Sequence, residues 1–343
     1  MRNRVIGGEF ELQVVPNVEP HIRDCFCYAS GRTALYHILK SIRPSICKVW
    51  LPDWLCGSLI DAVNLAGVDY GFYALGNDLR MNVGDFVDQE RPDSDCDVIV
   101  LVNYFGLVDI DKTITELRSL GVYSKIIEDD VQALFSFLDL IPHKADYRFT
   151  SLRKSIAAPD GGLVWTKCEM PLVNKENTFA PFKLMGALIK GAANNNSDDS
   201  EYLKLFERGE ELIDENYSSV MSKEAAMVFT ATDLQAAANK RRENARFLIA
   251  ELLTMGIEPL LSLSEGQVPL FLPIMINNRD DIRFALKKNS IFCPVHWPLR
   301  DDMQQLSMGR LMAEKELSLV VDQRYNSGDM QSIVDVLKEW ICK

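Results

Sequence analysis

The sequence predicts an α/β protein with a large domain built on a mainly parallel sheet and a small α+β domain at its C-terminal end. In the first half of the 343-residue chain, short apolar runs alternate with amphipathic segments of helical period. This pattern is typical of strands that are covered on both faces by helices. After a long helical segment at 232–255 the pattern becomes strand, helix, strand, helix. We therefore expect a large domain with an N-terminal arm at 1–230 and a small domain at 231–343.

The elements follow from periodicity. Helical spacing of apolar residues predicts helices, and continuous apolar runs predict buried strands. In the large domain we expect helices at 31–42, 55–66 and 111–120, and strands at 47–52, 69–75, 97–104, 124–128, 147–151 and 161–166. In the small domain we expect strands at 269–276 and 290–296, and helices at 280–288 and 328–341. The stretch 179–222 is less regular, and its polar cluster at 194–200 predicts a surface loop near the mouth of the site.

Lys154 is the first candidate for chemistry. It lies between two strand-like runs, just before a tight Asp160-Gly161-Gly162 turn. A lysine contributes little to packing there, because its ammonium must stay hydrated or find a partner, whereas a partly desolvated lysine can attack a carbonyl and form a Schiff base. Ser151, three residues earlier, offers a hydroxyl to a phosphate on the same cofactor. An ordinary polar loop can contain the same residues, so this segment alone does not decide the function.

Three consecutive acids, Glu128, Asp129 and Asp130, end an apolar run upstream of the lysine. Ligands of α/β sheets gather at such carboxyl ends of strands. A carboxylate at this place keeps the pyridine nitrogen of pyridoxal phosphate (PLP) protonated, so that the ring acts as an electron sink. The alternative is that the acids cap the following helix. Three acids exceed what one cap requires, which favours a functional role for Asp129.

A possible phosphate site precedes the first predicted helix. Ser30, Gly31, Arg32 and Thr33 place hydroxyls and a small residue before the helical pattern. Backbone N–H groups at a helix start bind anions, and glycine lets a phosphate approach closely. A simple serine N-cap would explain the serine equally well.

Taken in this order, these residues resemble the DegT/StrS-type PLP-dependent sugar aminotransferases, which belong to fold type I (aspartate aminotransferase-like). Residues 30–35 resemble the family's phosphate loop. Residues 128–133 resemble the segment whose aspartate contacts the pyridine nitrogen and whose glutamine, here Gln132, contacts the ring hydroxyl. The spacing from Lys154 to Gly161-Gly162 matches that from the family's Schiff-base lysine to its Gly-Gly pair. The resemblance extends from residue 7 to residue 298.

The resemblance implies a fold type I enzyme with a seven-stranded sheet in its large domain. It implies PLP as cofactor, Lys154 as the catalytic residue, and amino transfer from a glutamate-like donor to a keto-sugar, expected to be nucleotide-linked and to serve nucleotide-sugar and cell-surface polysaccharide synthesis. Where the family has Ser-Phe-His before the lysine, this chain has Phe-Thr-Ser, so Ser151 takes the phosphate-binding role. The residue that covers the cofactor ring is either Trp54 or Cys56.

Two alternatives to an aminotransferase remain open. The first is a PLP-fold protein that has lost catalysis and serves as a binding or regulatory subunit, and the presence of both Lys154 and Asp129 argues against it. The second is a PLP-dependent sugar dehydratase. The dehydratases of this family characteristically replace the lysine with histidine, which argues against that alternative too.

Further expectations concern the substrate side and the partner. Tyr104, at the end of a buried strand, and His296, in a segment that the resemblance places near the substrate, are candidates for lining the pocket, although local turn or hydrogen-bond roles are equally compatible. We expect Arg241 and Arg242 to form ion pairs on the surface of a helix. The resemblance implies a homodimer. The arm at 5–15 is apolar for a free tail, so we expect it to dock on the partner subunit rather than on its own domain.

Composition restricts the partners. The formal net charge of −12 disfavours nucleic acid and anionic membranes. Neither a signal peptide nor an apolar run of membrane length is visible, and we expect a cytoplasmic enzyme. The cysteines show no framework spacing and predict reduced thiols, and Cys25 and Cys27 lack the spacing of a zinc site, so we expect no metal. The eight cysteines are residues 25, 27, 47, 56, 96, 168, 293 and 342.

Overall fold

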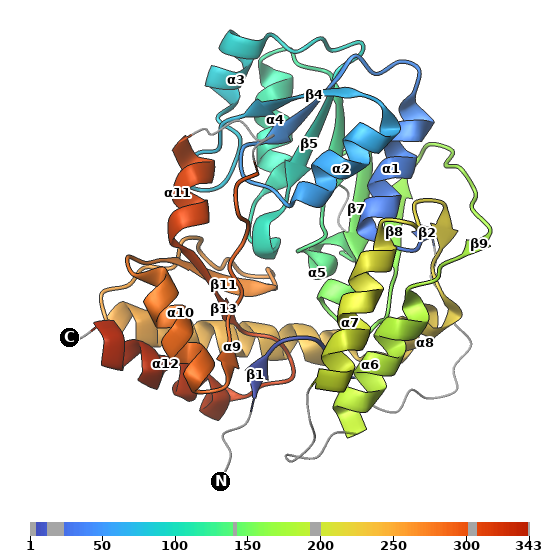
Figure 1. The fold of residues 1–343 in the computed structure, drawn as a ribbon. Helices are drawn as coiled ribbons and strands as arrows, with labels where there is room; N and C mark the ends of the chain where they lie inside the picture. The colour runs from blue at the N-terminus through green and yellow to red at the C-terminus, as the bar shows by residue number, and fades with distance from the viewer. Residues whose placement is uncertain (1–4, 12–23, 140–142, 193–199, 301–306, 342–343) are drawn as a thin grey trace.

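A seven-stranded sheet forms the centre of the large domain in the computed structural model, which describes residues 5–11, 24–139, 143–192, 200–300 and 307–341 (Figure 1). The strand order is β2-β8-β7-β6-β5-β3-β4, and β8 alone runs antiparallel to its neighbours. The strands are β2 (Phe26–Tyr28), β3 (Lys48–Pro52), β4 (Asp69–Tyr73), β5 (Val98–Val102), β6 (Lys125–Asp129), β7 (Tyr147–Ser151) and β8 (Gly162–Thr166). This confirms the predicted mainly parallel, seven-stranded sheet.

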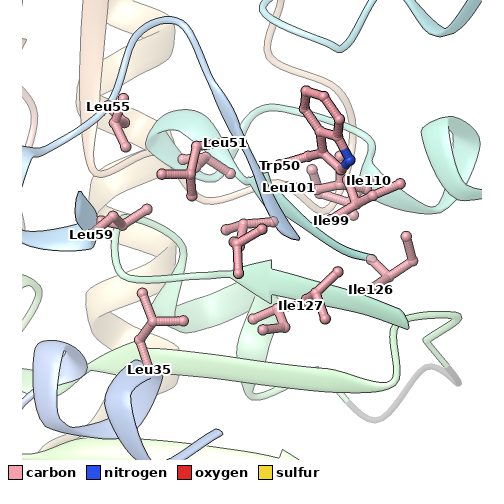
Figure 2. Packing of buried hydrophobic residues seen from close by; sticks show 14 of the residues in the cluster. Leu35, Trp50, Leu51, Leu55, Leu59, Ile99, Leu101, Ile110, Ile126 and Ile127 are labelled. Carbon is pink, nitrogen blue, oxygen red and sulfur yellow. The ribbon is translucent and has the colours of Figure 1, made fainter. Parts of the chain in front are cut away.

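Helices that connect the strands complete the large-domain core. They are α1 (Gly31–Ile42), α2 (Gly57–Ala66), α3 (Val83–Glu90), α4 (Ile110–Ser119), α5 (Leu134–Phe137), α6 (Ala180–Ala192), α7 (Ser200–Ile213) and α8 (Lys223–Ala231). The five residues of β5 are all buried, as expected of a strand covered on both faces. Figure 2 shows how Leu51, Ile99 and Ile127 from three neighbouring strands pack together with Leu35 of α1. The apolar core of the large domain thus lies between the sheet and its covering helices.

The small domain lies apart from the seven-stranded sheet (Figure 1) and has its own apolar core. An antiparallel pair, β11 (Phe271–Met275) and β13 (Glu316–Val320), packs with α9 (Leu234–Thr254), α10 (Arg279–Lys288) and α12 (Ser327–Ile341). A further short strand, β12 (Ile291–Phe292), pairs in parallel with β1 (Ile6–Gly7) near the N-terminus. One C-terminal helix, α11 (Ser307–Lys315), packs instead on the large domain: its Met312 lies in the large-domain core, and the Gly309 N–H donates to Asp53 at 3.1 Å. No helix in the described part of the chain is long and apolar enough to cross a membrane.

The stretch 179–222 differs most from expectation. It contains the two long helices α6 and α7 and a short strand, β10 (Ser219–Val220), which pairs with β9 (Lys175–Glu176). Most of the predicted polar loop, residues 194–199, lies outside the described residues.

The small domain also differs in two strands. The strand predicted at 290–296 is limited to β12, because Pro294 has no N–H to give to a ladder. The sequence reading missed β13, whose alternating Glu316 and Ser318 resemble an exposed strand although both are fully buried.

The N-terminal arm contacts its own chain. Gly7 donates its N–H to the Tyr325 hydroxyl at 2.7 Å, and Arg324 binds the carbonyl oxygens of Gly8 and Glu9 at 3.1 and 2.8 Å. For residues 5–11 the expectation of docking on a partner subunit is therefore wrong. The remainder of the predicted arm, residues 12–15, lies outside the described residues.

One pair of cysteines departs from the expectation of reduced thiols. Cys47 and Cys96 form a disulfide, with their Cα atoms 5.2 Å apart. The pairing joins the residue before β3 to the turn before β5, 49 residues later, and spacing along the sequence gives no sign of it. The described free cysteines are residues 25, 27, 56, 168 and 293.

Arg148 is a buried cation between β6 and β7. It is 2% exposed, and its guanidinium lies 3.0 Å from a Glu128 oxygen and 2.6 Å from an Asp130 oxygen. It also donates to the carbonyl oxygens of Ser136 and Phe137. Two of the three consecutive acids are therefore part of a structural ion-pair network behind the strand ends.

Replacing this cation should destabilise the fold strongly. In Arg148→Met the two carboxylates stay buried without their partner, so we expect a loss of about 3–5 kcal/mol in the free energy of unfolding. Urea unfolding at neutral pH measures it, with the exposed Arg246→Met as control. A loss below about 1 kcal/mol, the range of surface pairs, would contradict the structural role.

Candidate active site

The predicted site residues converge where β6 and β7 end, beside the start of α1. Gly31, the first residue of α1, lies so close to both strand ends that a Cβ on it would be 2.9 Å from Val131 Cγ2 and 3.5 Å from Ser151 Cβ. A larger residue would push the helix away from Val131. The glycine therefore brings the helix start, the turn after Asp129 and the turn before Lys154 together.

The Gly161-Gly162 turn joins the lysine segment to the helix start. A Cβ on Gly162 would overlap the carbonyl of Ser30, so β8 can pass beneath the helix start only when this position is a glycine. Gly161, at φ +107°, donates its N–H to Ala29 O at 2.8 Å and accepts from Leu152 N at 2.9 Å. These contacts give a physical reason for the spacing between Lys154 and the two glycines.

The start of α1 combines a serine cap with several groups that could bind a phosphate. Ser30 accepts a hydrogen bond from Thr33 N at 3.1 Å, and the two hydroxyls lie 3.0 Å apart. The other first-turn N–H groups of a helix have no partner within it. Arg32 pairs with Asp214, while its buried Nε has no hydrogen-bond partner among the residues that the structure describes. The serine thus acts as an N-cap, as one interpretation of the sequence expected, at a place that also suits an anion.

The strand alternation separates Asp129 from its two acidic neighbours. Glu128 and Asp130 face Arg148, while Asp129 points to the opposite face and is 3% exposed. Asp129 Oδ1 accepts the N–H of Val131 at 2.8 Å. Burial raises the pKa of Asp129 to about 7, against the opposing effects of the Val131 N–H and the charge of Lys154. The acids do not cap α5, which starts after Ala133 without a side-chain cap.

Gln132 follows Asp129 and is 6% exposed. Its Oε1 accepts the N–H of Phe105 at 3.1 Å. This bond fixes the amide and leaves Nε2 as a donor.

Lys154 ends a short turn, η2 (Leu152–Lys154), directly after β7. Its side chain is exposed and lines a cavity of about 720 Å³. Burial lowers the pKa of Lys154, and the neighbouring Arg153 adds to the decrease. A smaller proton affinity increases the fraction of neutral amine at neutral pH, which is the nucleophilic form.

A carboxylate that the sequence reading missed, Glu210 of α7, lies beside this turn. Arg153 and Lys183 contact its carboxylate at 2.8 and 2.6 Å. Burial alone would raise the pKa of Glu210, but Arg153, Lys183 and Lys154 together lower it to about 2. The lysine turn is therefore held against α7 by a permanently ionised acid.

Two side chains of the small domain donate hydrogen bonds to Ser155, the residue that follows Lys154. The carbonyl oxygen of Ser155 accepts hydrogen bonds from Arg241 Nη2 at 3.1 Å and Gln323 Nε2 at 2.9 Å. Arg241 is 1% exposed and also binds the carbonyl oxygens of Pro269 and Leu270. The lysine turn is therefore fixed from both domains.

The prediction that Arg241 and Arg242 form ion pairs on the surface of the helix is wrong. Arg241 is buried as described, and Arg242 donates to the carbonyl oxygens of Gly266 and Gln267 at 2.8 and 3.0 Å. The spacing of Arg241 from the buried Ala237 and Ala245 is four residues on either side. That helical period places Arg241 on the buried face and could have revealed it.

Trp54 and Tyr104 form an aromatic layer away from the cavity lining. Both are 1% exposed, their rings stack at 5.1 Å, and Trp297 packs on Trp54 at 4.9 Å. The Tyr104 hydroxyl donates to the carbonyl of Trp54. Cys56, at the start of α2, is half-buried.

His296 makes local hydrogen bonds. Its ring Nδ1 lies 3.0 Å from Ser318 Oγ, and its backbone N–H donates to the Glu316 carboxylate at 2.8 Å. The ring packs edge-on against Phe105 and Trp297. The geometry is that of a histidine that organises buried polar groups.

Comparison with known proteins gives a fold relationship. No protein-family model and no curated protein sequence matches the chain. Among solved structures, a DegT/DnrJ/EryC1/StrS aminotransferase from Brucella abortus is 18% identical (TM-score 0.65; 93% of this chain and 86% of that chain are covered). The sugar aminotransferase CalS13 from Micromonospora echinospora is 14% identical (TM-score 0.67; 92% and 87%). DesI, solved in the presence of its TDP-sugar product, is 15% identical (TM-score 0.66; 94% and 81%). The likeness confirms the predicted α/β fold, which this chain shares with these aminotransferase structures.

The raised pKa of Asp129 predicts a stability effect in the cofactor-free protein. The carboxyl ionises near pH 4 when unfolded but holds its proton to about pH 7 when folded. Its stabilising contribution is therefore complete below about pH 4 and is lost as the pH rises through about 7. An asparagine side chain at this position would keep the bond from Val131 without ionising. We expect Asp129→Asn to melt at a higher temperature than the wild type at pH 8, with a smaller difference at pH 5.

Thermal unfolding followed by circular dichroism measures both temperatures, with the exposed Asp88→Asn as the matched control. If Asp129→Asn melts at pH 8 at the same temperature as the wild type or below it, ionisation of Asp129 does not destabilise the folded protein.

Proposed function

We propose that the protein is a divergent DegT/StrS-type, PLP-dependent aminotransferase that moves an amino group from a glutamate-like donor to a nucleotide-linked keto-sugar. The meeting of the start of α1 with the ends of β6 and β7, which carry Asp129 and the turn of Lys154, carries this proposal. It is supported by the likeness to DegT/StrS-type and sugar aminotransferase structures and by the TDP-sugar that accompanies DesI.

The residues fit the cofactor by their chemistry. Asp129 has one oxygen bound to Val131 N and the other available for a pyridine N–H. The buried Nε of Arg32 lacks a partner at the helix start that would take the phosphate. When bound, PLP would supply an electron sink that stabilises negative charge on the donor carbon.

Each residue then has a definite task. The hydroxyls of Ser30, Thr33 and Ser151, with the N–H groups of Gly31 and Arg32, would hold the phosphate. Asp129, ionised beside a cationic pyridinium, would keep the ring nitrogen protonated. Gln132 would donate Nε2 to the ring hydroxyl.

Lys154 would hold the cofactor covalently and later carry a proton. Freed by the donor amine, its neutral amino group would take the proton from the donor Cα and return it at C4′ of the cofactor. The lowered pKa of Lys154 suits this task, because a base must be neutral before it accepts. The bonds from Arg241 and Gln323 to Ser155 would hold the lysine in reach of both atoms.

For the ring cover we propose Cys56 rather than Trp54, because Cys56 lies near Lys154 while Trp54 is enclosed by Tyr104 and Trp297. Tyr104 and His296, proposed from the sequence as substrate contacts, would act instead by packing against this aromatic layer.

The proposal includes a homodimer and a cytoplasmic location. Met185 and Leu188 of α6 and Leu203 of α7 are 52%, 44% and 51% exposed, which supports a partner surface on this helical hairpin. The composition supports the cytoplasm. The Cys47–Cys96 disulfide opposes it, because disulfides are rare in reducing compartments.

Turnover tests the function. We expect the PLP-loaded protein to convert glutamate and a TDP-linked keto-sugar into 2-oxoglutarate and an aminated sugar, both measured by mass spectrometry. Lys154→Ala should abolish this, and Asp129→Asn should lower it at least ~10²-fold through the loss of a preorganised charge.

The exposed Lys167→Ala is the matched control and should react like the wild type. Full turnover in Lys154→Ala would contradict the catalytic assignment. Cofactor binding without transfer to any keto-sugar would instead favour a binding or regulatory protein.

A further inference from the structure

The first part of the N-terminal arm, residues 5–11, is built into the small domain. Its strand β1 pairs with β12, and the Tyr325 hydroxyl accepts the N–H of Gly7 at 2.7 Å. A Cβ on Gly7 would overlap the carbonyl oxygen of Phe292, and the φ of this residue is +94°, so only glycine allows the arm to lie this close to β12. The start of the arm therefore has one fixed position on the small domain.

Two acceptors in the second part of the arm each bind both domains. The carbonyl oxygen of Glu9 accepts hydrogen bonds from Arg324 of the small domain at 2.8 Å and from Lys190 of α6. The Glu11 carboxylate lies 3.3 Å from an Arg324 nitrogen and 3.8 Å from Lys190 Nζ. Arg324 is itself oriented by two hydrogen bonds to the Asp322 carboxylate, at 2.9 and 2.8 Å. The arm is therefore a tie between α6 and the small domain.

Phe10 lies between these two acceptors in the chain and packs beside the lysine turn. The Arg324 guanidinium carbon is 4.2 Å from the centre of its ring, a cation–π contact. With residues 156–159 and side chains of α6 and α7, the ring encloses a space of only about 20 Å³, room for about one water molecule. Residues 156–159 continue the turn that carries Lys154. The half-buried ring thus connects the small domain with the lysine turn.

The lysine turn needs such support because it is a single 3₁₀ turn. The N–H groups of Ser155 and Ile156 both donate to the carbonyl of Leu152 at 3.0 Å, and Leu152 N donates to Gly161 O at 2.9 Å. One turn by itself gains too few hydrogen bonds to offset the entropy of ordering its backbone. Its position therefore depends on the side chains that pack against it.

We propose that the arm supports the lysine turn and that Phe10 is its positioning residue. Arg324 and Lys190 hold the arm between the domains, and the ring of Phe10 packs on residues 156–159, so that Lys154 keeps its place in the cavity. The part that Lys154 plays in amino transfer rests on the proposed function, whereas the packing of the arm does not.

Hydrogen exchange followed by mass spectrometry tests this support in the full-length, cofactor-free protein. In Phe10→Ala we expect the N–H groups of Ser155 and Ile156 to exchange at least about tenfold faster, because the turn opens locally once the ring is gone. Phe10→Leu keeps most of the apolar volume and should restore slow exchange. The matched control is Phe247→Ala, which removes a half-buried ring from the small-domain core and should leave exchange in the lysine turn unchanged.

The anchor on α6 gives a second test. Lys190→Ala should also accelerate exchange at Ser155 and Ile156, whereas the exposed Lys204→Ala of α7 should not. The proposal is overturned by unchanged exchange in Phe10→Ala, and equally by unchanged exchange in Lys190→Ala. An equal acceleration in Phe247→Ala would show a loss of overall stability rather than of local support, and would overturn it too.

Kinetics of the PLP-loaded protein separate positioning from substrate binding. With glutamate and a TDP-linked keto-sugar, Phe10→Ala should lower kcat at least about tenfold and leave the KM for glutamate within about twofold, because a displaced amine loses its alignment for proton transfer. A raised KM with an unchanged kcat would show that the arm is a wall of the substrate site and would overturn the positioning role. The exchange experiment requires neither cofactor nor turnover, so failure of this support is distinguishable from failure of the proposed function.

Discussion

The close packing of α1 against β8 and the turn after β6 is the constraint on which the site depends. Gly162 lets β8 pass under the carbonyl of Ser30, and Gly31 lets the helix start touch Val131. Without these two approaches, the start of α1 would move away from Asp129 and from the lysine turn. Backbone contact, rather than any single side-chain bond, therefore sets the distances between the groups that are proposed to hold one cofactor.

The second constraint joins the two domains at the lysine. Ser155 accepts bonds from Arg241 and Gln323 of the small domain, while Arg153 pairs with Glu210 of α7. The turn that carries Lys154 is thus fixed on both sides, while its amino group remains directed into the cavity. A displacement of the small domain would move Ser155, and with it the lysine. This coupling gives the position of the small domain a direct influence on the amino group of Lys154.

The sequence was sufficient for six of the seven strands of the sheet, although not for β2, because buried strands are apolar runs. It also placed Asp129 and Lys154 at strand ends, where ligands gather. It was insufficient where tertiary contacts override local pattern. Glu316 and Ser318 look exposed but are buried, and His296 contacts both. The apolar arm looked like a surface for a partner, yet Tyr325 and Arg324 hold residues 7–9 on their own domain. The roles of Glu210 and Gln323 required distances between segments far apart in the chain.

The central claim is that Lys154 is the residue that binds PLP covalently. Borohydride reduction of the PLP-loaded protein, followed by peptide mapping with mass spectrometry, measures this directly. The account predicts a single reduced adduct on the peptide containing Lys154, and no loss of cofactor after extensive dialysis of the reduced protein. An adduct on another lysine such as Lys183, or no adduct in a protein that retains PLP before reduction, would contradict it.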